Sequence, residues 1–406
     1  MKKTLIKLYY YVRFLINLII LFFDIIRLIF FLSTKKKQEI YTLFKGGFGH
    51  TISEPHFMNI TNDVNWLIII ALDKNFHNKN IKKLFGNNIF FIKKTSIFWK
   101  YHLEINFFLS KLIYTLFKKK VVDVEDFILK KSEKRFPNDF HKMIESITFP
   151  KFNEFKNHDL YKDKISKKRY EKILSSFEFK KGIINFHLRG KASKTSTNDG
   201  LSSFRDSEEI NFYKDTIEKI ISQGWLIIIT GEINKVPNWV SDQKKKIITF
   251  SSLKLNKDDY NFFSLIVSEI YIGPNSGPIM FNLIMPEKKT LLLNTLPFGH
   301  GHLNSIVSYP IFDFKSLNEF KNSFMYDLYY YINKSYENLK KKNMRRLNKK
   351  ETEEIIFDFL KNIDSKYGKS LEDIKINNGL IESCSFKISD KWLELIKYQN
   401  LNHGKR

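Results

Sequence analysis

The feature that most constrains the fold is a regular alternation of apolar runs with amphipathic segments between residues 181 and 315. Short apolar runs bounded by turn residues are typical of strands that are buried on both faces. Strands that alternate with helices predict a parallel sheet with helical crossovers. The predicted strands are Gly182–Leu188, Trp225–Thr230, Ile247–Phe250, Glu269–Ile272 and Thr290–Asn294, and the predicted helices are Ser207–Gln223 (with Ser207 as N-cap), Asp258–Val267 and Gly277–Met285.

A less regular version of the same pattern covers residues 38–180. It contains strand-like runs at Ile40–Phe44, Asn65–Leu72 and Asn88–Ile92 and a long amphipathic helix at Ile97–Phe117, and then a polar, lysine-rich stretch at 121–180 that we expect to be helical. The chain is therefore predicted to be α/β, with two Rossmann-like domains. The expected divisions are a hydrophobic helix at 1–37, one domain at 38–180, a second at 181–315 and a helical tail at 316–406.

The N-terminal segment, residues 4–32, is unusually apolar and aromatic. A membrane-spanning helix needs about 20 apolar residues with few charges, whereas the longest clean stretch nearby, Phe14–Phe23, is half as long. Asp24 and Arg27 follow, and their spacing lets them pair on one face of a helix. No small-residue cleavage site follows, so we expect no cleaved signal peptide. The pattern favours a helix in the cytoplasmic membrane surface or a short anchor, and a buried helix of the soluble domain is the alternative.

Charge and composition limit the possible partners. The chain has 68 basic and 43 acidic residues and a net charge of +25, which favours anionic partners such as a membrane surface or phosphorylated ligands. Lysines scattered over the surface would give the same net charge without an anionic partner. The lysine clusters are spread along the whole chain, which fits this alternative. The aromatic residues lie mostly in apolar runs, which makes them core residues, and we expect no nucleic-acid partner. The single cysteine, Cys384, excludes a disulfide scaffold and a thiolate metal cluster.

Three motifs fall at the carboxyl ends of strands in the second domain, the edge where parallel sheets bind ligands. GPNSGP, Gly273–Pro278, can offer backbone amides and a helix start to a phosphate. His187 and Arg189 share one face of a strand end, and the arginine fork suits a diphosphate. Gly231 and Glu232 could contact a nucleoside. Each motif alone could equally be an ordinary turn or a surface salt bridge. The predicted donor-binding residues here are His187, Arg189, Gly231, Glu232, Asn275, Ser276 and Gly277.

A fourth motif, KGGFGH, follows the first strand of the N-terminal domain. Its glycines Gly46, Gly47 and Gly49 lack the spacing of a P-loop, and we interpret them as a loop facing the acceptor. His50 and Glu54 are four residues apart on the following helix, so they share a face and either could act as a general base on an acceptor hydroxyl. A structural role is the alternative. No spacing of ligands predicts a metal site.

In this order, the motifs resemble those of a family of bacterial glycosyltransferases. The resemblance includes the glycine loop ending at Thr51 with Glu54 downstream, the His-x-Arg strand end, and the SGP loop at Ser276–Pro278. More distantly, the His-x-Arg strand looks like that of fucosyltransferase-type enzymes and the SGP loop like that of heptosyltransferases. The loop after Arg189, GKASKTSTNDG, departs from the fucosyltransferase pattern, so fucose is not assigned. The other matching positions are Arg205, Tyr213, Gly231 and Asn294.

The resemblance implies a GT-B fold, in which two Rossmann-like domains face a cleft. It also implies a metal-independent glycosyltransferase that moves a sugar from a nucleotide diphosphate sugar to a cell-surface polysaccharide or lipid-linked glycan precursor. The candidate catalytic residues are His50, Glu54 and Arg189, and Arg205 joins the donor-binding set. We expect no cofactor, and a cytoplasmic location at the inner membrane of a bacterium. The alternatives are an inactive scaffold or glycan-binding protein of the same fold, and a nucleotide-sugar epimerase.

Overall fold

The computed structural model divides into two compact units, Met1–Lys134 and Arg135–Arg406, each described by itself. The predicted domain boundary lies instead at 180–181. Most residues between 134 and 181 lie outside the part of the chain that the structure describes. The structure describes residues 2–34, 39–43, 49–61, 65–72, 78–93, 101–124, 126, 161, 164–190, 206–231, 236–285, 287–295, 305–311, 345–364, 367–369, 373 and 387–403.

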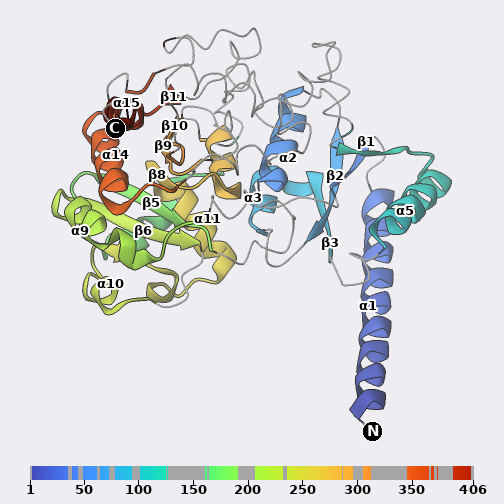
Figure 1. Cartoon of the computed structure of the whole chain (residues 1–406). Coiled ribbons are helices and arrows are strands. Elements are labelled where there is room, and N and C mark those ends of the chain that lie inside the picture. Colours follow the sequence, from blue (N-terminus) through green and yellow to red (C-terminus); the bar gives the residue numbers. More distant parts are fainter. Residues whose placement is uncertain are drawn as a thin grey trace. The chain divides into compact units, whose positions relative to one another are not determined.

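The first unit is built on a four-stranded sheet in the order β3-β2-β1-β4, and every pair of neighbours is parallel (Figure 1). Three of the strands are the predicted apolar runs. The fourth, β4, lies at the start of the stretch that we expected to be helical, so that expectation is wrong there. β4 has only three residues, all partly exposed, and it follows three lysines, so no apolar run marks it. The strands are β1 (Glu39–Leu43), β2 (Trp66–Leu72), β3 (Ile89–Lys93) and β4 (Val121–Asp123).

Helix α1 (Lys2–Ser33) has two parts with different surroundings. Its last third packs in the core of the first unit, where Leu28 and Leu32 are buried among residues of the sheet and of helix α5 (His102–Phe117). Asp24 accepts a hydrogen bond from Arg27 at 2.9 Å, as the spacing predicts, and another from the Lys93 backbone N–H at 2.8 Å. The part before Asp24 carries a row of exposed apolar side chains instead. The other helices of this unit are α2 (His50–Thr61), α3 (Ile81–Phe85) and the 3-10 turn η1 (Gly86–Asn88).

The second unit is built on a seven-stranded sheet in the order β11-β10-β9-β8-β5-β6-β7, again with only parallel neighbours. Counted from β5, this is the 3-2-1-4-5-6 order of doubly wound Rossmann-type sheets, extended by β11. The predicted α/β class with parallel sheets is therefore confirmed. The strands are β5 (Gly182–Leu188), β6 (Trp225–Gly231), β7 (Ile247–Ile248), β8 (Ile270–Gly273), β9 (Lys289–Leu292), β10 (Ser305–Val307) and β11 (Lys387–Ile388).

The C-terminal residues form part of this second core. β11 extends the sheet beside β10, and Leu347, Ile355 and Trp392 are buried in the same cluster as β5 and β8. Trp392 Nε1 donates to the Tyr309 carbonyl oxygen at 2.7 Å. Of the tail that we predicted to be mainly helical, the described residues include two helices, α14 and α15, which pack against this core. The helical elements are η4 (Lys167–Tyr170), α8 (Glu171–Leu174), η7 (Ile210–Tyr213), α9 (Lys214–Ser222), α10 (Asn238–Asp242), η8 (Phe250–Ser252), α11 (Lys257–Val267), η9 (Gly277–Leu283), α14 (Lys349–Lys361) and α15 (Asp390–His403).

Candidate functional site

The strand order gives the second unit a topological switch point between β5 and β8. From β5 the chain adds β6 and β7 on one side and then returns to add β8 on the other. Connections therefore leave the carboxyl ends of β5 and β8 in opposite directions, and ligands of doubly wound sheets bind in the crevice that this opens. Arg189 directly follows β5, and the Gly273–Pro278 loop begins at the last residue of β8. The topology thus brings the first two predicted motifs to one position.

Gly273 allows the two strand ends to come close together. A Cβ atom at this position would lie 2.7 Å from the carbonyl oxygen of His187 and 3.0 Å from its Cβ. No side chain fits there without displacing the backbone of β5. The glycine at the start of the loop is therefore explained by the packing of β8 against β5, which seats the loop beside His187.

His187 is held by a chain of polar side chains beneath the switch point. It is 8% exposed, and its Nδ1 lies 3.0 Å from Thr230 Oγ1. The Thr230 hydroxyl donates its one hydrogen to Asn185 Oδ1 at 2.6 Å, so its oxygen is left to accept from His187 Nδ1–H. This tautomer leaves Nε2 as a hydrogen-bond acceptor.

Burial lowers the pKa of His187 to about 4, and the positive charge of Arg189 lowers it in the same direction. His187 is therefore neutral at pH 7. The positive charge beside it belongs to Arg189, whose field also lowers the pKa of Tyr271 against the larger effect of burial, which raises it. The two residues that the sequence paired thus differ in kind: one is a neutral hydrogen-bonding ring and the other is a cation.

Two backbone-level contacts fix Arg189 and correct a prediction. The Arg189 N–H donates to Ser207 Oγ at 2.9 Å, and the Ser207 N–H donates to the Arg189 carbonyl oxygen at 2.8 Å. Ser207 is thus tied to the end of β5 and is not the N-cap that we predicted. The helical segment begins later, as the 3-10 turn η7, with Glu209 extended in front of it. A serine followed by two glutamates is typical of a helix start. Only the position of β5 shows that Ser207 instead accepts a hydrogen bond from the Arg189 backbone.

Tyr271 organises the loop after β8. Its hydroxyl donates to the Pro274 carbonyl oxygen at 3.1 Å and lies 3.3 Å from Ser276 Oγ, while its ring stacks on His187 with centroids 5.8 Å apart. Asn275 is 4% exposed. The predicted helix from Gly277 is the 3-10 helix η9. Its few, poorly aligned dipoles make a weak anion site, so phosphate binding here would depend on the loop amides and Arg189.

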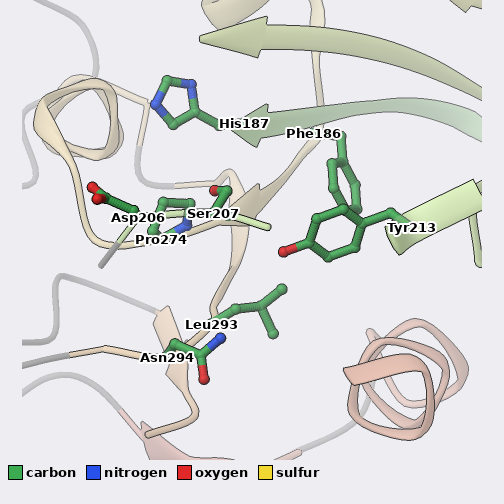
Figure 2. Close-up of a pocket in the computed structure, with 9 residues that line it drawn as sticks. Phe186, His187, Asp206, Ser207, Tyr213, Pro274, Leu293 and Asn294 are labelled. Carbon is green, nitrogen blue, oxygen red and sulfur yellow. The ribbon is translucent and has the colours of Figure 1, made fainter. Parts of the chain in front are cut away.

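A small pocket opens at the switch point, and Figure 2 shows its lining. Asp206 was not found by sequence reasoning. It is 5% exposed, and its Oδ1 has no hydrogen-bond partner among the residues that the structure describes. The Tyr213 hydroxyl lines the pocket from the other side and points toward Ser207 and Pro274. No sequence signal separates Asp206 from other loop aspartates, because the pocket forms only when 206–207 lies along the end of β5. The lining residues are Phe186, His187, Asp206, Ser207, Tyr213, Gly273, Pro274, Leu293 and Asn294.

Gly231 has a structural explanation at the end of β6. Its φ is +94°, and a Cβ atom would lie only 1.8 Å from the Leu188 carbonyl oxygen. The glycine is therefore required by the approach of β6 to β5, whether or not a nucleoside also contacts it. Glu232 and Arg205, the other predicted contacts here, lie outside the described residues. Their roles stay predictions.

The first unit has the same kind of switch point between β1 and β4, and α2 follows β1 there. The Gly49 carbonyl oxygen accepts from the Ile52 N–H at 3.0 Å and the Ser53 N–H at 2.9 Å, so Gly49 starts the helix. Glu54 is 3% exposed. Gly46, Gly47 and the side chain of His50 lie outside the described residues. The buried polar residues of α2 are Thr51, Ser53, Glu54 and His56.

Among the described residues, no three His, Cys, Asp or Glu side chains gather closely enough to hold a metal ion. The polar groups at the two switch points are instead an arginine, neutral or hydroxyl side chains, and isolated carboxylates. The arrangement in the second unit can bind a ligand that carries both negative charge and hydroxyl groups, because it offers a cation, an imidazole acceptor and a carboxylate together.

Comparisons with known proteins give only distant similarities. No protein-family model and no curated protein sequence matches the chain. The chain is similar to the E. coli heptosyltransferase WaaC with ADP-2-deoxy-2-fluoro heptose, with 10% identity over 68% of this chain and 93% of that one and a TM-score of 0.37. It is similar to the Neisseria meningitidis UDP-GlcNAc 2-epimerase bound to UDP-GlcNAc, with 11% identity over 63% of this chain and 82% of that one and a TM-score of 0.35. It is also similar to the NodZ alpha-1,6-fucosyltransferase soaked with GDP-fucose, with 10% identity over 62% of this chain and 93% of that one and a TM-score of 0.26. Scores this low assign neither a family nor an activity.

Proposed function

We propose that the chain is a glycosyltransferase of the GT-B type and that the switch point of the second unit binds its nucleotide diphosphate sugar donor. The observation that carries this proposal is the meeting of Arg189, neutral His187 and the Gly273–Pro278 loop at one crevice of a 3-2-1-4-5-6 sheet. Doubly wound sheets bind nucleotides at this position. The order of motifs along the sequence, which resembles that of bacterial glycosyltransferases, supports the same function.

In this proposal Arg189 and the backbone amides at Asn275, Ser276 and Gly277 hold the diphosphate. A guanidinium fork matches two phosphate oxygens, and loop amides add hydrogen bonds without charge. Negative charge develops on the leaving diphosphate during transfer, and a fixed cation stabilises it without a metal ion. His187 Nε2 would accept from a ligand hydroxyl, since its other nitrogen is engaged by Thr230. Asp206 would accept from a second hydroxyl in the pocket.

The first unit would supply the acceptor side. Gly46 and Gly47 precede α2, which begins at the switch point of that sheet, and Glu54 or His50 would remove the proton from the acceptor hydroxyl. The acceptor that we propose is a cell-surface polysaccharide or lipid-linked glycan precursor. The reason is the apolar N-terminal helix, which would keep the enzyme where such acceptors are made.

Helix α1 supports a position at the cytoplasmic face of a bacterial inner membrane. Residues Leu8–Ser33 are long and apolar enough to cross a membrane, with a mean hydropathy of 2.5 and only 17% of an 18-residue stretch of it buried. A core helix of a soluble protein would be mostly buried, and here only the end near Leu28 and Leu32 is. We propose that the exposed part anchors the chain in the membrane.

A thermal-shift screen with nucleotides and nucleotide sugars, with and without magnesium, tests the donor site. A ligand that binds only the folded protein raises the unfolding midpoint. At a ligand concentration one hundred times its Kd, the free energy of unfolding rises by about 2.7 kcal/mol. We expect one nucleotide diphosphate class to raise it without magnesium, and Arg189→Ala to abolish the shift. Arg169→Ala, an exposed arginine before β5, is the matched control and should keep it. No shift with any nucleotide would contradict the proposal and favour an inactive scaffold.

A further inference from the structure

Helix α5 carries an apolar face that the core of the first unit does not use. Its inward face is Ile105, Leu109 and Ile113, spaced four residues apart and buried. The outward face would be polar on an ordinary surface helix. Here it carries large aromatic and aliphatic residues that are more than half exposed, beside the polar residues Glu104, Lys111 and Thr115. The exposed fractions are 65% for Leu103, 72% for Phe107, 54% for Phe108 and 59% for Tyr114.

This face lies next to the place where α1 leaves the core. Leu28 and Leu32 of α1 pack in the same cluster as the inward face of α5. Figure 1 shows α5 beside the C-terminal part of α1, with the rest of α1 extending past the sheet. In that extending part the apolar side chains are exposed on successive positions and hence on every side of the helix, as from Tyr9 to Val12. A helix that is apolar all round and uncovered by protein fits hydrocarbon better than water. Two exposed apolar surfaces thus lie on helices of the same unit that pack beside each other.

The charges around α5 match an anionic surface. Lys111 lies on the outward side of the helix, and Lys118 and Lys120 are exposed at its end. Lys118 Nζ lies 5.9 Å from the centre of the Tyr114 ring, so cation and aromatic share one region. A helix with aromatic residues on its free face and lysines around them is typical of one that lies at the boundary between lipid headgroups and acyl chains. Each lysine near an anionic leaflet strengthens binding about fivefold.

We infer that the outward face of α5 is a second membrane-binding surface, which lies in the headgroup region of the same anionic bilayer that α1 enters. Lipid covers Leu103, Phe107 and Tyr114, and the lysines contact anionic headgroups. With two contacts at different depths, the first unit has a fixed orientation on the bilayer, which a single flexible anchor would not impose. The inference rests on the proposed membrane contact of α1 and is independent of donor binding.

An environment-sensitive label tests this inference on the full chain. The one cysteine is replaced (Cys384→Ser), and a nitrobenzoxadiazole label is attached at Phe107→Cys or, as a control, at Phe250→Cys, an aromatic residue of the second unit that is 48% exposed. The probe is a vesicle of phosphatidylcholine with phosphatidylglycerol. We expect the label at 107 to brighten about threefold or more and to be quenched by lipids carrying a shallow spin label, as apolar burial at an interface requires. The label at 250 should not change.

Three outcomes would overturn the inference. The label at 107 could keep its emission in water while sedimentation shows the protein on the vesicles, which would leave α1 as the sole contact. It could brighten with protein concentration in the absence of lipid, which would identify a second copy of the chain as the partner. It could respond equally to neutral phosphatidylcholine, whereas the lysines predict at least about fivefold more lipid for half-response there. The thermal-shift screen with soluble nucleotides separates any of these from a failure of the donor site.

Discussion

The carboxyl edges of the two sheets share a topology and differ in chemistry. Each sheet starts at an inner strand, β1 or β5, adds two strands on one side and then crosses to the other. At the second edge the structure places glycines that admit close backbones, a neutral imidazole and one arginine. At the first it places a helix with a buried carboxylate, Glu54. In both sheets the topology marks the switch point as the place where a ligand would bind. Under the proposed function, the second edge would bind the donor and the first would carry the acid–base chemistry.

The sharpest test of this difference compares Glu54→Gln with Arg189→Ala. Loss of a general base slows transfer by about 10²–10⁴-fold, and we expect Glu54→Gln to do so while the donor still raises the unfolding midpoint. Arg189→Ala should lose both the transfer activity and the donor-induced rise in the unfolding midpoint, because the donor no longer binds. Release of nucleotide diphosphate from the donor identified by thermal shift measures transfer, and Glu104→Gln, an exposed carboxylate, is the control. Full activity of Glu54→Gln with loss in His50→Gln would move the base to His50. Loss of the donor shift in Glu54→Gln would break the division between the edges.

A second test compares two glycines with positive φ, one in each unit. Gly231 in the second unit has φ +94° and a Cβ there would lie 1.8 Å from Leu188 O, whereas Gly86 in the first has φ +61° and nothing within 4 Å. Gly86→Ala should cost about 1–3 kcal/mol of stability from backbone strain alone, since its φ of 61° and ψ of −131° lie outside the left-handed helical region. Gly231→Ala adds a backbone clash and should cost about 3 kcal/mol or more. Unfolding calorimetry measures both. Equal costs would show that the backbone of β5 shifts to admit the new Cβ atom without a loss of stability.

The buried imidazole gives the second edge a pH dependence. The pKa of His187 is about 4 in the folded chain and about 6.5 when unfolded. Between these values the unfolded chain binds more protons, so stability falls as the pH falls. The slope is about 1.4 kcal/mol per pH unit, or about 2 kcal/mol between pH 6.5 and 5. Urea titrations should show this loss in the natural chain and a flatter profile in His187→Gln. Identical profiles would mean that the pKa of His187 is the same in the folded and the unfolded chain.

The sequence predicted the parts of the fold whose signal is local. Strands buried on both faces, such as Gly182–Leu188, are long apolar runs, and they were located with little error. β4, β10 and β11 were missed because strands of only two or three residues carry no such run. They belong to their sheets only through the strands beside them.

The candidate site divides in the same way. Arg189 and Ser276 were found because they follow predicted strands, whose carboxyl ends meet at one edge. Asp206, and the use of Ser207 as a partner of Arg189, were not found, because both depend on a segment that returns to the end of β5. The structural role of Gly231 and Gly273 was also hidden, since a glycine that admits a neighbouring backbone looks the same in sequence as one that admits a ligand.

The smallest expected effect concerns the C-terminal segment that borders the second edge. The Leu347 N–H donates to Asn294 Oδ1 at 3.0 Å in a buried position, and Arg346 pairs with Glu208 at 2.8 Å, with side chains 26% and 36% exposed. Losing the buried acceptor in Asn294→Ala should cost about 1–2 kcal/mol. Losing the solvent-screened pair in Arg346→Gln should cost less than about 1 kcal/mol.

The donor affinity of Arg346→Gln tests whether Arg189 alone supplies the positive charge at the second edge. If Arg189 is the cation that holds the diphosphate, Arg346→Gln should leave the donor Kd within about twofold, because its charge is already neutralised by Glu208. A tenfold or larger loss, measured by titrating the donor against the same variant, would mean that the pair opens and that Arg346 faces the ligand. The second edge would then draw its positive charge from two separate segments, and the C-terminal residues would belong to the binding site as well as to the core.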